Sequence, residues 1–245
     1  MTIGTAVPDA SQLRAVKHYF IQDHSIHVPY TAGQYEMEAL SLIEDLFSQG
    51  HATLVVSGGS MFYIDALCRG LDNMPDADPD LRRELTRRIR EEGVESLRMD
   101  LKRLDPEAYR TIDIANPQRV LRAVEVCLLS GRPFSSFKLS EGKKRDFEIR
   151  KIGLSRPRDV LYDRINRRVD AMMEAGLLEE ARSLLAYRDL PALQTVGYKE
   201  MFAYLDGKCT LEEAVRDMKT ATRRYAKKQL TWWKRDPDIE WIELP

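Results

Sequence analysis

The side chains best suited to chemistry lie between residues 216 and 235, where basic and aromatic residues are interleaved. This stretch holds eight basic residues and one acid, although the net charge of the whole chain is −1. Steps of three and four residues place six side chains on one helix face: Val215, Met218, Thr222, Tyr225, Gln229 and Trp232. A neighbouring face carries Arg216, Lys219, Arg223, Lys227 and Lys234. A helix that is packed on one side and cationic on the other suits a polyanion that also offers flat rings, such as RNA. A merely solvated helix is the alternative.

A glycine-rich turn, Gly58-Gly59-Ser60, forms a second candidate site. It follows the apolar run Leu54–Val56, which predicts a buried strand over 52–57, and it precedes a helical pattern over 61–68. Glycines would let a ligand approach the backbone, and the helix N-terminus would offer amides to an anion. A plain strand-to-helix turn is the competing explanation. The chain has neither the Gly-x-x-x-x-Gly-Lys-Ser/Thr nor the Gly-x-Gly-x-x-Gly pattern of phosphate-binding loops.

Two more cationic groups stand on predicted helices. The first turns of a helix over 118–130 carry an amide and two guanidinium groups suited to phosphates and base edges, from Gln118, Arg119 and Arg122. Arg164 and Arg168 are four residues apart on a helix predicted over 158–187, so they point the same way and could hold a diphosphate. Ordinary surface ion pairs, with Asp163 and Asp170 for the second group, compete with both interpretations.

Composition excludes several classes of protein. Hydrophobic content of 43% and charged content of 31% over 245 residues are typical of a soluble globular chain with one large or two small domains. No apolar run approaches the roughly 20 residues of a membrane span, and the start lacks the features of a signal peptide. The three cysteines are far apart and form no zinc-type pair with a histidine. We therefore expect a cytoplasmic protein without a structural zinc.

The order of predicted elements is typical of an α/β fold. Strands are expected at 52–57, 147–154 and 239–244. Helices are expected at 36–49, 61–68, 80–92, 94–104, 105–109, 118–130, 158–187, 200–204 and 211–233, so that 80–140 is all-helical. Three strands are few for a parallel sheet, which usually has about five.

In this order and register, these motifs closely resemble the bacterial tRNA dimethylallyltransferase family. The resemblance covers essentially the whole chain and rests on Ile3-Gly4-Thr5-Ala6 with Pro8, Val56–Tyr63, Ala77-Asp78-Pro79 with Arg82, Asn116–Arg119 with Arg122–Val126, Arg164-Ile165 with Arg168, Val196–Met201 and Ala226–Trp232. It implies transfer of a dimethylallyl group from dimethylallyl diphosphate to N6 of the adenine 3′ of the anticodon. It also implies that this base is flipped into a channel, since a stacked amine cannot be alkylated.

The resemblance also implies an architecture and a set of site residues. The fold would be a P-loop-NTPase-like parallel sheet core, 1–80 and 145–245, with a helical insertion domain at 81–144. Arg164, Arg168 and Thr5 would serve catalysis, the two arginines by binding the diphosphate. Residues that bind the tRNA anticodon stem-loop would be Ser60, Arg82, Gln118, Arg119, Arg122, Gln194, Gly197, Tyr198, Lys199, Lys227, Lys228, Gln229, Thr231, Trp232 and Lys234. A Mg²⁺ cofactor, a monomeric state and no membrane partner are expected as well.

The chain departs from the family at its start. In the family, a P-loop and a strand that carries the proposed general-base aspartate precede the Ile-Gly-Thr-Ala segment, whereas this sequence begins at that segment. We therefore expect an incomplete sheet, and little transferase activity from these 245 residues alone. A non-catalytic RNA-binding remnant and an adenylate-type isopentenyltransferase are the alternative functions.

Overall fold

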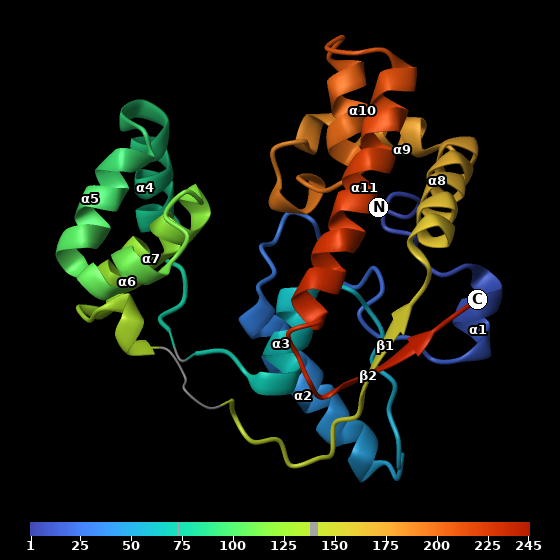
Figure 1. The fold of residues 1–245 in the computed structure, drawn as a ribbon, viewed down its shortest axis with the longest axis horizontal. Coiled ribbons are helices and arrows are strands. Elements are labelled where there is room, and N and C mark those ends of the chain that lie inside the picture. The colour runs from blue at the N-terminus through green and yellow to red at the C-terminus, as the bar shows by residue number, and fades with distance from the viewer. Residues whose placement is uncertain (73, 138–141) are drawn as a thin grey trace. The chain divides into compact units, whose positions relative to one another are not determined.

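The computed structural model describes residues 1–72, 74–137 and 142–245. It divides into two units, which Figure 1 shows in one view: a core unit, Met1–Cys68 with Asp146–Pro245, and a helical unit, Arg69–Arg145. The helical unit thus begins before the boundary at 81 that the family suggests, because the segment that leads into its first helix belongs with it.

Local capping signals build the helical unit. Three of its helices begin with proline in the first turn, after Asp78, Asp105 or Asn116, and each of these side chains accepts two backbone N–H bonds. Such caps each stabilise a helix by roughly 1 kcal/mol. The helices are α4 Pro79–Glu92, α5 Val94–Leu104, α6 Pro106–Thr111 and α7 Pro117–Ser130, followed by the 3₁₀ turn η1 Phe134–Phe137. They enclose a core of Leu85, Leu97, Leu101, Ala108, Val120, Leu121, Ala123 and Val124.

The core unit holds the remaining helices. They are α1 Ala10–Ala15, α2 Ala32–Ser48, α3 Met61–Arg69, α8 Arg158–Glu174, α9 Leu177–Ser183, α10 Tyr198–Leu205 and α11 Leu211–Trp233, with the 3₁₀ turns η2 Leu185–Tyr187 and η3 Pro191–Leu193. The single helix predicted over 158–187 is wrong. Gly176, at φ 98°, ends α8 and begins α9, because a left-handed residue cannot continue a right-handed helix.

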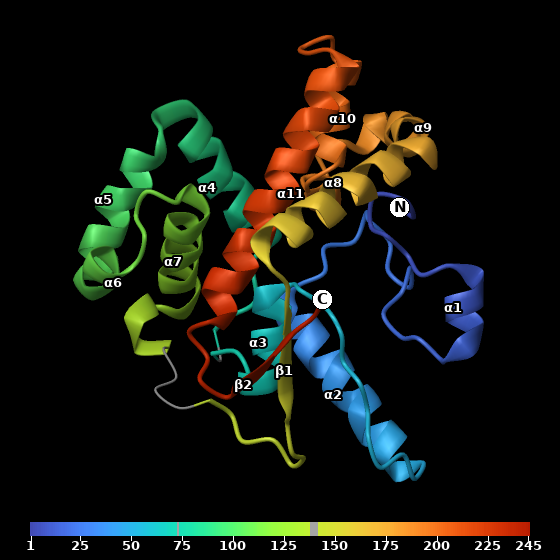
Figure 2. The ribbon, with the colours of Figure 1, turned by 45° about the vertical axis from the view of Figure 1, so that its right-hand side comes forward.

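Helices α8 to α11 pack together around one hydrophobic cluster. Figures 1 and 2 both show α11 beside α8 and α10, with the N-terminus close to the same helices. Buried side chains from all four helices and from η3 form the cluster: Val169, Leu177, Ala181, Leu193, Tyr198, Met201, Phe202, Ala214 and Met218. Met1 and Ile3 pack against it, so the first residues of the chain are anchored to these helices.

Two parallel strands lie in the described part of the core unit. β1, Lys151–Ser155, pairs along its whole length with β2, Ile239–Glu243, with Gly153 opposite Trp241. A Cβ at Gly153 would lie 2.7 Å from the Trp241 ring, so glycine allows the indole to cover the strand. Helices around a small parallel sheet make the fold α/β, as predicted.

The strand predicted over 52–57 is wrong. Residues 51–60 have no regular secondary structure, and the side chain of Val55 is 89% exposed. An apolar run becomes a strand only when a neighbouring strand takes up its backbone hydrogen bonds, and the described residues bring none to this segment. Among the described residues, no helix is both long and apolar enough to cross a bilayer.

Candidate functional site

The inner face of α11 holds the glycine-rich turn. The Gln229 side-chain amide donates a hydrogen bond to the Gly59 carbonyl (2.8 Å), and the Tyr225 hydroxyl donates to the same oxygen (3.4 Å). One turn further on, the Trp232 indole N–H donates to an Asp65 carboxylate oxygen on α3 (2.8 Å). The prediction that these three α11 side chains share one face is therefore confirmed.

This contact requires glycine at position 59. A Cβ there would lie 2.1 Å from the Gln229 amide nitrogen, whereas one at Gly58 would find its nearest neighbour at 3.9 Å. The carbonyl of the next residue, Ser60, accepts N–H bonds from Tyr63 and Ile64, which starts α3. Ser60 itself is exposed, so the turn presents a hydroxyl at the N-terminus of a helix whose backbone α11 holds in place.

The cationic face predicted for α11 is partly taken up by contacts with α8. Lys219 forms an ion pair with Asp170 (2.5 Å), and Arg223 donates to Asn166 (2.7 Å), so both cations bind α8. The predicted tRNA-binding residues beyond them are exposed: Lys227, Lys228, Thr231 and Lys234. The three lysine ammonium groups among these have no partner in the described parts of the chain.

Arg164 and Arg168 remain available on α8. The two aspartates that could have paired with them have other partners, because Asp163 binds Arg167 (2.7 Å) and Asp170 binds Lys219. Both arginines are exposed and have no ion-pair or hydrogen-bond partner within 1–72, 74–137 and 142–245. On α8, Tyr162 and Asn166 contact Arg223 of α11. Arg164 and Arg168 each follow one of these residues by two positions, which is about half a helical turn, so they point away from α11.

Tyr198 and Gly197 lie inside the protein. Tyr198 is fully buried, and its hydroxyl donates to Glu180 (2.5 Å). Gly197, at φ 99°, is the buried residue that immediately precedes α10 in the sequence, and it donates its N–H to the Glu200 carboxylate (2.7 Å). Because both residues are buried, they offer little surface for direct contact with RNA, and their part in tRNA binding stays a prediction. The other two members of this predicted group, Gln194 and Lys199, are exposed.

Glu180 was not found by sequence reasoning. Its carboxylate accepts backbone N–H bonds from Thr2 (2.8 Å), Ile3 (3.0 Å) and Gly4 (3.0 Å), in addition to the Tyr198 hydroxyl. Burial alone would raise the pKa of Glu180, but the hydrogen bonds outweigh it and hold the pKa below its usual value. Burial, and then the bond to Glu180, raise the pKa of the Tyr198 hydroxyl. Thr5 is exposed on the turn that these contacts hold.

Two of the four predicted residues of the helical unit, Arg82 and Arg122, share one buried carboxylate. Glu125 is fully buried on α7 and accepts hydrogen bonds from Arg82 (2.9 and 2.5 Å) and from Arg122 (2.7 Å). Arg122 also donates to the Pro75 carbonyl (2.8 Å). Arg82 and Arg122 are thus held in fixed positions with part of each guanidinium side chain still exposed, whereas Gln118 and Arg119 are exposed at the start of α7.

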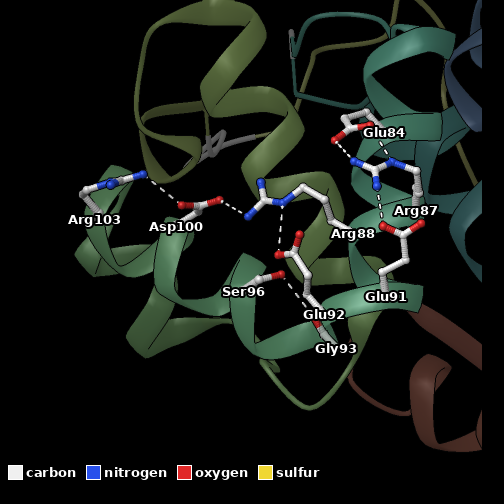
Figure 3. Close-up of polar contacts among 9 residues, drawn as sticks. All are labelled: Glu84, Arg87, Arg88, Glu91, Glu92, Gly93, Ser96, Asp100 and Arg103. Atoms are coloured by element: carbon white, nitrogen blue, oxygen red, sulfur yellow. Dashed lines mark hydrogen bonds and ion pairs between the residues drawn. The ribbon is translucent and has the colours of Figure 1, made fainter.

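Most other charges on α4 and α5 pair with one another. A hollow of about 310 Å³ along α4 is lined by Arg82, Arg83, Thr86, Arg87 and Arg90. Figure 3 shows Arg87 bonded to Glu84 and Glu91, and Arg88 joined to Glu92 and to Asp100 of α5. The helical unit therefore shows paired charge here, not a field of one sign.

The described residues do not gather a metal site. No three His, Cys, Asp or Glu side chains within them could hold a metal ion together. The magnesium implied by the resemblance therefore stays a prediction for this chain.

The geometry therefore brings some of the predicted residues together, in three separate groups. Ser60 lies on the turn held by Gln229 and Trp232, Thr5 lies on the turn tied to Tyr198, and Arg82 and Arg122 share Glu125. The family model described as IPP transferase matches residues 1–236. The chain belongs to the IPP transferase family.

Relatives within the IPP transferase family match almost the whole chain. A tRNA dimethylallyltransferase 1 of Bacteroides thetaiotaomicron is 48% identical over 242 residues, which are 99% of this chain and 78% of that protein. A tRNA dimethylallyltransferase of Christiangramia forsetii is 48% identical over 244 residues, covering 100% of this chain and 80% of that protein.

Solved structures of the family share the fold. The crystal structure of a tRNA isopentenylpyrophosphate transferase from Bacillus halodurans has a TM-score of 0.67 and 37% identity, over 98% of this chain and 76% of that one. A eukaryotic dimethylallyltransferase acting on tRNA has a TM-score of 0.76 over 98% of this chain and 63% of that one. Its identity of 24% supports the likeness of fold alone.

Proposed function

We propose that this protein transfers a dimethylallyl group from dimethylallyl diphosphate to N6 of the adenine 3′ of the anticodon in tRNA. In this reaction the bond between C1 of the allyl group and the diphosphate oxygen breaks, and a bond from N6 to C1 forms. The diphosphate leaves with the electron pair, and N6 loses one proton. The activity named for the relatives supports the reaction type, and the core unit supplies groups that suit both substrates.

The observation that carries the proposal is that the two faces of α11 differ: one makes internal contacts and the other is exposed and cationic. Its inner side chains fix the Gly59 carbonyl and the start of α3, while Lys227, Lys228 and Lys234 remain exposed and without a described partner. Exposed lysines that make no internal ion pair can neutralise RNA phosphates, and the fixed turn beside them can receive a nucleotide. A free mononucleotide would not need so extended a cationic surface.

Arg164 and Arg168 suit the diphosphate. Two guanidinium groups one helical turn apart, neither of which binds a described residue, can stabilise the negative charge that grows on the leaving group. We expect magnesium to enter with the diphosphate, whose oxygens are the ligands it prefers. An EDTA titration of the transfer rate tests this, and light scattering tests the expected monomer.

The transfer reaction itself is tested with radiolabelled dimethylallyl diphosphate and an anticodon stem-loop. The acceptor should be labelled when adenine stands 3′ of the anticodon, and not when guanine, which has no amine at position 6, replaces it. AMP should accept no label. Stem-loop binding should weaken steeply with salt, by a slope near the number of phosphates contacted. Labelling of AMP in preference to the stem-loop would support the adenylate-type alternative, and salt-sensitive binding without transfer would support the RNA-binding one.

Arg164→Ala separates chemistry from binding. Loss of a group that binds only the developing charge should lower the transfer rate on the order of 100-fold and leave the stem-loop Kd nearly unchanged. Arg167→Ala is the matched control, because Arg167 stands on the same helix but pairs with Asp163. A variant Arg164→Ala that lost affinity and kept its rate would place this side chain on the RNA instead.

A further inference from the structure

We propose that Glu180 is a positioning residue, which folds the turn Thr2–Ala6 against α9 and α10 and so sets the place of the Thr5 hydroxyl. The inference rests on the proposed function and on the catalytic role that the resemblance implies for Thr5. It assigns a task to Glu180 and gives Tyr198 of the Val196–Met201 motif an internal role in place of RNA contact.

The Glu180 carboxylate is saturated by this turn and Tyr198 together. A carboxylate offers about four acceptor positions, and four donors fill them here. Oε2 accepts the N–H groups of Thr2 and Ile3, and Oε1 accepts the N–H of Gly4 and the Tyr198 hydroxyl. Bonds to an ionised acceptor are stronger than bonds between neutral groups, so three consecutive backbone amides are held at one point.

Fixing these amides also fixes Thr5. The Ala6 N–H donates to the Ile3 carbonyl (3.0 Å), and the Val7 N–H donates to the Thr2 carbonyl (3.1 Å). The Thr5 hydroxyl donates to that same Thr2 carbonyl (3.3 Å). Ala6 stands at φ 50°, a conformation that a residue with a Cβ keeps only when its surroundings impose it. The turn therefore has little freedom once Glu180 holds its first residues.

Tyr198 completes the arrangement from the other side. Its ring lies so close to Gly4 that a Cβ on Gly4 would be 2.5 Å from Cζ. Since Tyr198 is fully buried, its ring has little room to move away from the turn. Gly4 and Tyr198 belong to two motifs far apart in the sequence, and Glu180 is the residue that joins them.

The contrast with Glu179 supports a specific role. Glu179 is the adjacent residue on α9, of the same chemical type, but it is exposed and makes no hydrogen bond with the turn among the described contacts. Glu179→Gln therefore removes one carboxylate from the same helix without touching the turn, and it is the matched control for Glu180→Gln.

A double-mutant cycle on the transfer reaction tests the inference in the protein that carries this sequence. Glu180→Gln keeps the side-chain shape but removes the charge, and we expect kcat to fall on the order of 100-fold with KM for the stem-loop changed less than about twofold. Thr5→Ala should cause a similar loss. If Glu180 acts through Thr5, the double variant should be no more than about threefold slower than the slower single variant. Glu179→Gln should keep the wild-type rate.

Multiplying losses in the double variant would overturn the inference, as would an unchanged kcat in Glu180→Gln. Amide hydrogen exchange at Ile3 and Gly4 gives a readout that does not need activity: both should be protected in the wild type and exchange at least about tenfold faster in Glu180→Gln. Equal exchange in the two proteins overturns the inference even if no transfer is seen, whereas absence of transfer by the wild type counts against the proposed function alone. If the Glu180→Gln variant does not fold, Tyr198→Phe replaces it, because this variant keeps the ring and removes only the hydroxyl that donates to Glu180. It should lower kcat about fivefold.

Discussion

Replacing Gly4 by alanine tests how tightly the first turn is packed against α10. The added methyl group would lie 2.5 Å from Tyr198 Cζ, 2.6 Å from its hydroxyl oxygen and 2.7 Å from Cε2. Real Cβ atoms do not approach a ring so closely, so either the ring or the turn has to move. The ring belongs to the cluster around α8 to α11 and is fully buried, which leaves it little room.

The two responses differ in their free-energy cost. Moving the ring overpacks the core, which typically costs about 1–3 kcal/mol. Lifting the turn off Glu180 breaks three N–H bonds to a charged acceptor, and such bonds contribute about 1.5–3 kcal/mol each, net of the water that replaces them. Moving the ring is therefore the cheaper response, and we expect a net destabilisation of about 2 kcal/mol.

Thermal unfolding followed by near-ultraviolet circular dichroism measures this change. About 2 kcal/mol corresponds to a fall in Tm of roughly 4–8 °C for a chain of this size. The matched control is Gly33→Ala on α2, where the nearest atom to the new Cβ is Thr31 Oγ1 at 3.9 Å. That variant should be as stable as the wild type, or more stable by up to about 1 kcal/mol, because alanine favours a helix over glycine.

A Gly4→Ala variant with the wild-type Tm would refute the reasoning. It would mean that the turn is not seated on Tyr198 and that the Glu180 contacts do not hold it. A loss of stability in Gly33→Ala of the same size would also refute it, because the effect would then belong to any added methyl group.

Three further predictions follow from the other close contacts. Gly59→Ala should displace the Gln229 amide from the Gly59 carbonyl, so that about 1 kcal/mol of hydrogen bonding that holds the turn is lost. Stem-loop binding should therefore weaken about 5- to 10-fold in a filter assay. The control variant Gly58→Ala should bind the stem-loop normally. The pKa of Glu180 is lower in the folded protein than in the unfolded chain. The ionised carboxylate therefore stabilises the fold at a pH above the unfolded-state pKa, and this stabilisation is lost as the pH falls through the folded-state pKa. Urea unfolding between about pH 5 and pH 3 should therefore show a shallower loss of stability in Glu180→Gln than in the wild type. Glu125→Gln should destabilise the helical unit by about 2 kcal/mol, measured by hydrogen exchange in α7, because two arginines lose their buried partner.

Most helices were predictable because their signals are local. The bounds of α5 and α11 match the predicted 94–104 and 211–233, where Gly93 and a Thr210 cap mark the starts. The strand at 52–57 was not predictable in this way, because its existence depends on a partner elsewhere in the chain. The break at Gly176 was a local signal in the sequence, and the prediction of one helix over 158–187 overlooked it.

The sequence by itself determined the family, the residue types available for chemistry and the helical face that unites Tyr225, Gln229 and Trp232. Only the tertiary structure decided which of these side chains turn inward. Tyr198 and Gln229 have polar groups that suit RNA, yet each binds another group within the core unit, whereas Lys227 is exposed and pairs with none of the described residues. Helical periodicity fixes which residues share a face, but what that face meets depends on elements far away in the chain. For the same reason Glu180 carried no signal of its own: its role exists only because the first turn folds onto α9.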